Sequence, residues 1–313
     1  MDAAGPGADT TAMRKLILMV AIVASAVVGT MVVNPGLRTK WYFAADRAWT
    51  AHWPLSLGKG VVRGLQPLIR PTAPAWVTVE PSITMLLDPD DYVSAEILRK
   101  GSWEPESWNA IRPYLTGDAV FVDVGAHTGY YSLKAAAALG PRGRVIAVEP
   151  NPPTLKKLQG NISASNASRV HVYPVACSDR DSTLVLSRAG TTPTSSTRAN
   201  ARQEGVAAGY RIRARPLDSI VLDDGVQRVD VIKIGVEGAE TLVLRGAQWT
   251  LDRFHPVVIV ELIEKQLQAK GTSSAELRRL LASHGYLARA EAGQNVVFRW
   301  DGGTGDGRPL ADD

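Results

Sequence analysis

The strongest constraint on the fold is a short apolar run that carries an acid and ends in a glycine turn. Residues 120–124 read Val-Phe-Val-Asp-Val, and Gly-Ala-His-Thr-Gly follows at 125–129. A continuous apolar run of this length favours a buried strand, and the glycines favour a tight turn that opens a helix. A second apolar run at 145–148 is followed directly by Glu149. The sequence therefore predicts two buried strands, each with an acid near its carboxyl end.

Strand and helix patterns alternate through most of the chain, which predicts a parallel sheet covered by helices on both faces. The predicted strands lie at 76–79, 120–124, 144–149, 170–175, 229–234, 257–261, 286–290 and 295–300, with an antiparallel pair at 184–186 and 210–213. A further apolar run lies at 83–87. The predicted helices lie near 92, 108–115, 129–139, 153–164 and 273–284, with another beginning at 238. We therefore expect one doubly wound α/β domain over residues 76–300.

The N-terminus carries an uncharged run of 18 residues, 16–33. This length is close to the minimum for a transmembrane helix, so we expect a single-pass anchor over 13–34. A cleaved signal peptide is the alternative, because Arg14-Lys15 and the alanines at 24 and 26 fit that plan. The basic and aromatic stretch 35–75 is typical of a membrane-proximal linker, which places the body of the protein in the cytoplasm; an ordinary solvated linker is the alternative.

Composition excludes several classes of protein. The formal net charge of +4 is too small to indicate nucleic-acid binding. The single cysteine, Cys177, excludes an intrachain disulfide framework, and the five histidines show no metal-ligand spacing. The polar tails 1–12 and 301–313 are expected to be disordered, and no oligomeric state is predicted.

Ligands of an open parallel sheet bind outside the carboxyl ends of its strands. Two acids there, with a helix N-terminus between them, suit a nucleoside that carries an amino acid, and S-adenosylmethionine is the leading candidate. Asp123 would face the ligand's ammonium or sulfonium group. Gly125, Ala126 and Gly129 would let the backbone approach the ligand. Glu149 would accept hydrogen bonds from the ribose hydroxyls.

Four further residues complete the predicted cofactor site. Pro150 and Asn151 directly follow Glu149. Ser178 and Asp179 follow the strand predicted at 170–175, where an acid can accept from an adenine amino group. Simpler structural roles remain as alternatives: Asp123 bracing the turn, Glu149 as a surface acid, and Ser178-Asp179 as a plain turn.

Several short motifs follow one another between residues 101 and 261. They are Trp103-Glu104-Pro105 and the segments 122–131, 146–151, 161–162, 176–179, 217–220 and 232–240. Together they resemble the FkbM-type methyltransferases, a class I family that depends on S-adenosylmethionine. The resemblance covers about half the chain, and it implies a seven-stranded, mostly parallel doubly wound sheet. It also implies methyl transfer to oxygen, with sugar and polyketide hydroxyls among the family's substrates.

The chain departs from this resemblance at Gly235. The family pattern reads Lys-Ile-Asp-x-Glu-Gly, whereas residues 233–238 read Lys-Ile-Gly-Val-Glu-Gly. The missing acid could orient the donor methyl group or the acceptor hydroxyl. Lys233 and Glu237 remain as the predicted catalytic residues, with Glu237 as the base at a helix N-terminus and Glu240 one turn further on.

Three other residues are weaker candidates. Glu104 could line the mouth of the site, and Glu261 could face it from the strand predicted at 257–261. His127 is expected to serve the backbone geometry of the turn.

Three hypotheses of function follow. The first is a membrane-anchored O-methyltransferase acting on a small molecule, a sugar, a glycolipid or a lipid-linked envelope precursor. The second is a degenerate member that binds a ligand without turnover, because of Gly235. The third is a nicotinamide-dependent oxidoreductase, which the glycine spacing disfavours.

Overall fold

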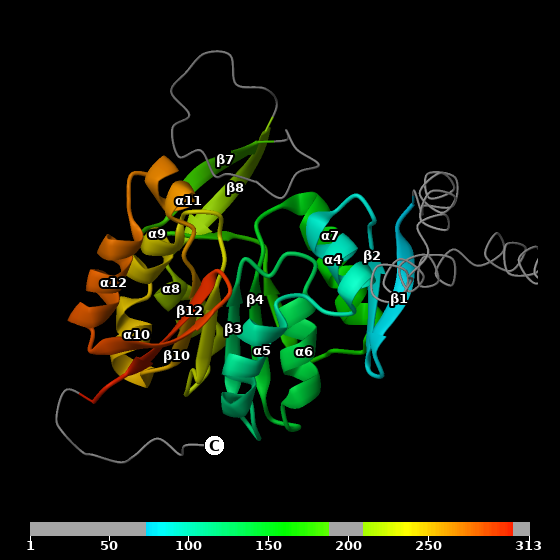
Figure 1. Cartoon of the computed structure of the whole chain (residues 1–313), viewed down its shortest axis with the longest axis horizontal. Coiled ribbons are helices and arrows are strands. Elements are labelled where there is room, and N and C mark those ends of the chain that lie inside the picture. Colours follow the sequence, from blue (N-terminus) through cyan, green and yellow to red (C-terminus); the bar gives the residue numbers. More distant parts are fainter. Residues whose placement is uncertain (1–72, 188–208, 303–313) are drawn as a thin grey trace, which may run out of the picture.

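The computed structural model describes residues 73–187 and 209–302 (Figure 1). The predicted anchor at 13–34, the tail at 1–12, most of the linker at 35–75 and residues 303–313 of the other tail lie outside the described residues. Among the described residues, no helix is both long enough and apolar enough to cross a bilayer.

The main sheet has seven strands in the order β11-β12-β10-β9-β3-β4-β5. The parallel strands are β3 (Val120–Val124), β4 (Arg144–Val148), β5 (Val170–Tyr173), β9 (Val231–Ile234) and β10 (Val257–Glu261). An antiparallel hairpin, β11 (Tyr286–Ala292) and β12 (Asn295–Trp300), completes the sheet beside β10. The predicted mostly parallel, seven-stranded sheet is therefore confirmed.

The strand order reverses between β3 and β9. From β3 the chain proceeds outward through β4 to β5, and it then returns to place β9 on the opposite side of β3. A crevice forms at such a reversal, because the connections leave neighbouring strands in opposite directions. The carboxyl ends of β3 and β9 thus mark the expected ligand site.

Helices cover both faces of the sheet. Successive residues of each strand point to opposite faces, and apolar residues on both faces are buried under helices. Phe121 packs on the face covered by α4 (Tyr92–Lys100), α5 (Pro105–Ile111), α6 (Tyr130–Ala138) and α7 (Pro152–Ala164). Val122 packs on the face covered by α8 (Leu217–Asp224), α9 (Glu240–Arg245), α10 (Gln248–Phe254), α11 (Glu264–Ala269) and α12 (Ser274–Ser283). Figure 1 shows these two groups of helices on either side of the sheet.

An N-terminal hairpin leans on helix α7. It consists of β1 (Ala75–Glu80), predicted as a strand at 76–79, and β2 (Ile83–Leu87), which the sequence marks only as an apolar run. The side chain of Asn161 on α7 accepts from the backbone N–H of Leu86 at 2.7 Å and donates to the Thr128 carbonyl at 2.8 Å. One buried amide therefore joins the hairpin to the turn that follows β3.

A second sheet of three strands has the order β6-β8-β7. Strands β7 (Ser182–Ser187) and β8 (Gly209–Arg215) form the predicted antiparallel pair. The two-residue strand β6 (Ala176–Cys177), which the sequence does not predict, pairs with β8. The strand predicted at 170–175 is therefore shorter than expected, because β5 ends at Tyr173 and β6 begins three residues later in the second sheet.

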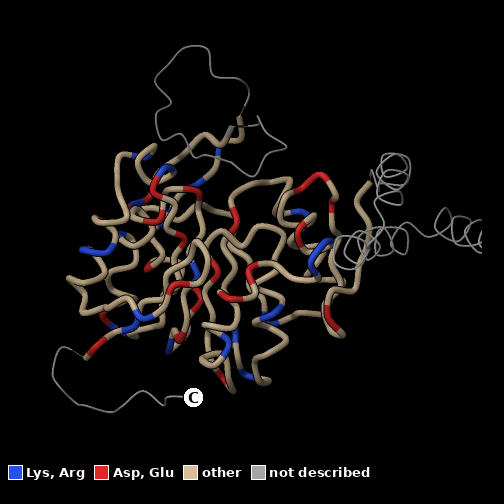
Figure 2. Tube along the Cα trace, viewed as in Figure 1, with Lys and Arg blue, Asp and Glu red and all other residues tan. Residues whose placement is uncertain are grey.

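Two predicted helices begin at other residues than expected. The helix predicted at 108–115 begins at Pro105 and ends at Ile111, where a 3₁₀ turn (Arg112–Tyr114) takes over. The helix predicted from 238 begins at Glu240. Charged residues of both signs are interspersed along the described trace (Figure 2).

Candidate functional site

A cavity of about 750 Å³ lies along the carboxyl ends of the central strands, where the strand order reverses. This volume is within the range of small-molecule sites. Its lining carries eight carboxylate side chains and four lysine or arginine side chains. The site therefore suits a ligand with cationic or hydrogen-donating groups.

The cavity has two ends, separated by the glycine turn after β3. We call the part lined by 148–151 and 176–179 the β4 end, and the part lined by Lys233, Gly235, Glu237 and Glu261 the β10 end. Of the predicted cofactor-binding residues, seven line the cavity: Gly125, Ala126, Glu149, Pro150, Asn151, Ser178 and Asp179.

The first glycine of the turn is required by a backbone contact. Gly125 has a φ of +78°, and a Cβ on it would lie 2.0 Å from the Gly235 carbonyl oxygen. The N–H groups of Gly125 and Ala126 both lie 3.0 Å from the Val148 carbonyl and donate to it. The turn is therefore fixed between the ends of β9 and β4.

Gly129 does not line the cavity. It precedes α6 with a φ of +93°, and a Cβ on it would meet Leu158 of α7 at 2.5 Å. Close packing between two helices explains this glycine, so the predicted approach to a ligand does not apply to it.

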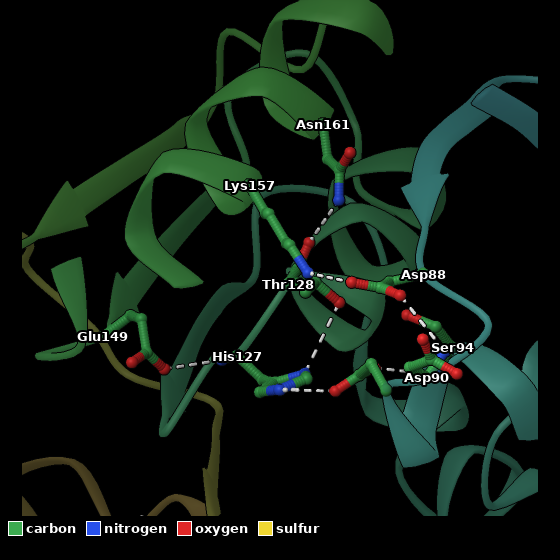
Figure 3. A network of polar contacts seen from close by, with 9 residues as sticks. Asp88, Asp90, Ser94, His127, Thr128, Glu149, Lys157 and Asn161 are labelled. Atoms are coloured by element: carbon green, nitrogen blue, oxygen red, sulfur yellow. Dashed lines mark hydrogen bonds and ion pairs between the residues drawn. The ribbon is translucent and has the colours of Figure 1, made fainter. Parts of the chain in front are cut away.

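His127 connects the turn to the N-terminal part of the domain (Figure 3). Its ring Nε2 lies 3.4 Å from Asp91, whose carboxylate also caps helix α4 by accepting from the Ser94 N–H at 2.8 Å. Burial lowers the pKa of His127, but the hydrogen bond and charge of Asp91 outweigh burial, so the pKa is raised. Burial likewise opposes the shift at Asp91, and the contacts with His127 and Ser94 lower its pKa to about 2. The pair favours a protonated imidazole next to the turn.

Glu149 is buried at the β4 end with both carboxylate oxygens held by the backbone. One oxygen accepts from the His127 N–H at 2.9 Å and the other from the Asn151 N–H at 2.8 Å. Burial raises the pKa of Glu149, while these hydrogen bonds and the charge of His127 oppose the rise. The contacts fix the orientation of the carboxylate beside the cavity.

Asn151 offers an unused acceptor nearby. Its side-chain oxygen is buried and has no hydrogen-bond partner among the described residues, although the residue lines the cavity. A buried polar atom without a partner is costly, so a ligand that donates a hydrogen bond there would remove the penalty.

Ser178 and Asp179 lie at the far side of the β4 end. The Ser178 hydroxyl is 3.2 Å from Asp179, which also pairs with Arg180 at 3.2 Å. Burial raises the pKa of the neighbouring Cys177 thiol to about 12, which disfavours the thiolate form that a nucleophilic cysteine needs.

Asp123 lies beneath the cavity and does not line it, unlike the sequence prediction. Its carboxylate accepts from Ser132 at 2.6 Å and lies 3.5 Å from the Lys233 ammonium. Lys233 lines the cavity and also donates to the Gly125 carbonyl at 3.1 Å. The charge that borders the cavity here is therefore the lysine's.

The expectation that Glu237 sits at a helix N-terminus is wrong, because α9 begins three residues later. Glu237 has a left-handed φ of +57°, lines the cavity and accepts from Gln266 at 2.6 Å. Burial and the charge of Glu240 raise its pKa. Glu240 itself is buried and accepts from the N–H groups of Val236 and Gly238, so it stabilises the turn.

Glu104 and Glu261, the two weaker candidates, both line the cavity. Glu104 accepts from the Tyr131 hydroxyl at 2.9 Å. Burial, with the charge of Glu237, raises the pKa of Glu261 to about 7.

Several residues that line the cavity are not predicted as site residues from the sequence. They include Asp91, Trp103, Tyr131, Lys157 and Asn295. Trp103 and Tyr131 stood within quoted motifs, and Asp91 precedes a predicted helix, where a capping acid is expected. Asn295 carried no local signal, because only the hairpin register places it opposite Glu261.

Comparison with known proteins gives one family match. Residues 123–288 match the family described as "Methyltransferase FkbM domain". This span contains the glycine turn and both ends of the cavity. It begins at Asp123 and includes Glu149, Lys233 and Glu261.

Two curated proteins are similar over just above half of the chain. AMB antimetabolite synthetase AmbE of Pseudomonas aeruginosa is 29% identical over 206 residues, which cover 55% of this chain and 10% of AmbE. Methyltransferase 1 of Beauveria bassiana is 27% identical over 192 residues, which cover 56% of this chain and 74% of that protein. The chain thus spans a tenth of the first relative and about three quarters of the second.

Solved structures show weaker likeness. Methyltransferase FkbM from Methylobacillus flagellatus KT has a TM-score of 0.40 and 19% identity, covering 66% of this chain and 52% of that chain. The O-methyltransferase from Bacillus cereus in complex with SAH has a TM-score of 0.37 and 16% identity, covering 63% and 79% of the two chains.

Proposed function

We propose that this chain, which belongs to the FkbM methyltransferase family, transfers the methyl group of S-adenosylmethionine to a hydroxyl group. The observation that carries the proposal is the arrangement of one cavity. Its β4 end holds the fixed carboxylate of Glu149, and its β10 end holds Lys233 among several carboxylates. A donor and an acceptor can therefore lie in line across the glycine turn.

The residues of the β4 end fit the donor. The fixed carboxylate of Glu149 suits the ribose hydroxyls, and the unpartnered oxygen of Asn151 suits a further hydrogen-bond donor. Ser178 and Asp179 suit the adenine amino group, and Gly125 with Ala126 forms the floor of the site. When bound, S-adenosylmethionine supplies a methyl group on a positively charged sulfur.

The β10 end suits the acceptor. Methyl transfer to oxygen depends mainly on positioning, together with a group that removes the hydroxyl proton. Lys233, held by Asp123 and the Gly125 carbonyl, can orient an acceptor oxygen with its remaining N–H. Glu237, the base expected from the sequence, and Glu261 both line this end, and these two carboxylates are the candidates for the base.

The acceptor class follows from the N-terminal sequence. The predicted anchor at 13–34 and the basic and aromatic stretch after it support a protein held at the membrane with its catalytic domain in the cytoplasm, with a cleaved signal peptide as the alternative. Tethering raises the local concentration of acceptors in the same membrane. A sugar hydroxyl of a glycolipid or a lipid-linked envelope precursor is therefore the proposed substrate, and a soluble small molecule is the alternative.

A transfer assay tests the reaction and the acceptor together. The full chain is incubated with methyl-labelled S-adenosylmethionine and either a membrane lipid extract or a soluble metabolite extract. We expect label in the lipid fraction that survives mild alkali, because methyl ethers resist conditions that release methyl esters. Label confined to soluble metabolites would contradict the membrane substrate, and alkali-labile label would contradict transfer to a hydroxyl.

A degenerate binding protein is the second candidate, and Gly235 is the observation that favours it. Its backbone φ is not in the left-handed region, and the atoms tightest against a Cβ there belong to the end of the flexible Lys233 side chain, at 3.1 Å, so an aspartate can occupy the position once that side chain shifts. Binding of S-adenosylmethionine without transfer in the native chain, combined with transfer in Gly235→Asp, would establish this second candidate.

A further inference from the structure

Gly235 lies close to two charged side chains that line the cavity. A Cβ at this position would lie 3.1 Å from the Lys233 ammonium and 3.9 Å from one carboxylate oxygen of Glu261. Glu261 ends β10, the strand that pairs with β9, and both Gly235 and Glu261 line the cavity. The carboxylate of Glu261 therefore borders the space that a side chain at Gly235 would enter.

Other carboxylates at this end of the cavity are already engaged. Glu104 accepts from the Tyr131 hydroxyl, and Glu237 accepts from Gln266. No hydrogen bond from another described residue holds the carboxylate of Glu261, whose surroundings act on it through burial and charge. Glu261 thus has its oxygens available for a bound molecule.

The surroundings also make Glu261 an unusually strong base for a carboxylate. Burial has the largest effect, and the carboxylates of Glu237, Glu240 and Glu104 add to it, while Lys233 opposes them. The pKa rises to about 7, so the carboxylate is both present and strongly basic at neutral pH.

We propose that Glu261 accepts the proton of the acceptor hydroxyl during methyl transfer, which rests on the proposed function. The acceptor O–H bond breaks and its proton moves to a Glu261 oxygen. The oxygen's electron pair forms the new O–CH₃ bond, and the electron pair of the broken C–S bond stays on sulfur. Glu261 then returns its proton to solvent. Glu237 is a positioning residue, because Gln266 holds it and its charge strengthens the base.

Proton release on ligand binding tests this proposal without turnover. S-adenosylmethionine carries a positive sulfur and S-adenosylhomocysteine does not, so only the first should drive a proton off a neighbouring Glu261. Calorimetric titrations of the full chain in buffers of different ionisation enthalpy count these protons. At pH 7, we expect up to about half a proton more to be released with S-adenosylmethionine, since Glu261 titrates at about 7.

Two variants identify the group. Glu261→Gln should lose the difference between the two ligands and still bind both. Glu237→Gln should keep the difference with its maximum moved to lower pH, because a neighbouring negative charge is removed. Loss of the difference in Glu237→Gln together with its retention in Glu261→Gln would overturn the assignment, as would an equal proton count for both ligands in the native chain.

The outcomes also separate this proposal from the one on which it rests. Failure of both ligands to bind would overturn the proposed function, and the assignment of Glu261 with it. Binding of both ligands without a difference in protons would overturn only the role of Glu261.

Discussion

Gly125 lies so close to Gly235 that a Cβ on Gly125 would be 2.0 Å from the Gly235 carbonyl oxygen. The Gly235 N–H also donates to the Val124 carbonyl at 3.0 Å, and Lys233 donates to the Gly125 carbonyl at 3.1 Å. The turn after β3 and the end of β9 are therefore in direct backbone contact at the point where the strand order reverses. This contact forms the floor between the two ends of the cavity.

Gly125→Ala should displace this floor. A left-handed backbone costs a residue with a Cβ about 1–2 kcal/mol, and the clash with Gly235 adds to that cost. Urea unfolding should show a loss of at least about 3 kcal/mol, and S-adenosylmethionine binding should be lost. Gly225→Ala is the matched control, because Gly225 has a φ of +72° and no atom within 4 Å of its Cβ position. Equal losses in the two variants would show that the contact with Gly235 does not matter.

Glu149→Gln should weaken donor binding and lower stability by about 1–3 kcal/mol, because one of the two backbone N–H groups that donate to Glu149 loses its acceptor. In the native protein two backbone N–H groups donate to the two carboxylate oxygens of Glu149. A glutamine has only one side-chain oxygen, and it lacks the negative charge that suits the ribose hydroxyls. Hydrogen bonds to a charged group contribute about 1.5–3 kcal/mol, so the Kd for S-adenosylmethionine should rise roughly 10- to 100-fold. Calorimetric titration measures this change, and an unchanged Kd would exclude Glu149 from the donor site.

Lys233→Met should destabilise the protein through Asp123. The aspartate is fully buried. One of its carboxylate oxygens faces the Lys233 ammonium, and the other accepts a hydrogen bond from the Ser132 hydroxyl. Removing one partner of a buried ion pair costs about 3–5 kcal/mol, because the remaining charge is left without compensation. The same substitution should cost much less in an Asp123→Asn background. Urea unfolding of the single and double variants gives the coupling energy, and additive effects would contradict a direct pairing.

Glu261→Gln should change how stability depends on pH. The pKa of Glu261 rises from 4.5 to about 7 on folding, so the folded protein keeps a proton that the unfolded chain has already lost between these values. The contribution of Glu261 to the stability of the native protein therefore falls as pH rises through this window. The variant lacks this titration, so its stability relative to the native protein should increase from pH 4.5 upward and level off above about 7. Parallel curves for the two proteins would show that Glu261 has an ordinary pKa.

Most of the fold could be predicted because its signals are local. The strand at 120–124 is apolar at four of five positions, and the structure buries all five. Strand β6 was not predicted because two residues are too few to show the alternation of apolar and polar side chains that is typical of a strand. Only the pairing with β8 defines this strand. The start of α9 was misplaced because Glu237 and Gly238 both adopt left-handed backbone before the helix begins at Glu240.

The candidate site was predictable where a residue stands at a strand end. Glu149 follows β4 directly, and its placement on the cavity needs only the rule for parallel sheets. Asp123 stands near a strand end as well, but as the fourth residue of β3 it is buried, which its position alone does not show. The free carboxylate of Glu261 depends on which neighbours donate hydrogen bonds, and no sequence pattern contains that information.

Titration of the full chain with S-adenosylmethionine, and separately with NAD, tests the assigned donor most directly. We expect S-adenosylmethionine and S-adenosylhomocysteine each to bind at a single site, with weaker binding in Glu149→Gln and no binding of NAD. Tight binding of NAD without binding of S-adenosylmethionine would contradict the methyltransferase function and favour an oxidoreductase on the same sheet.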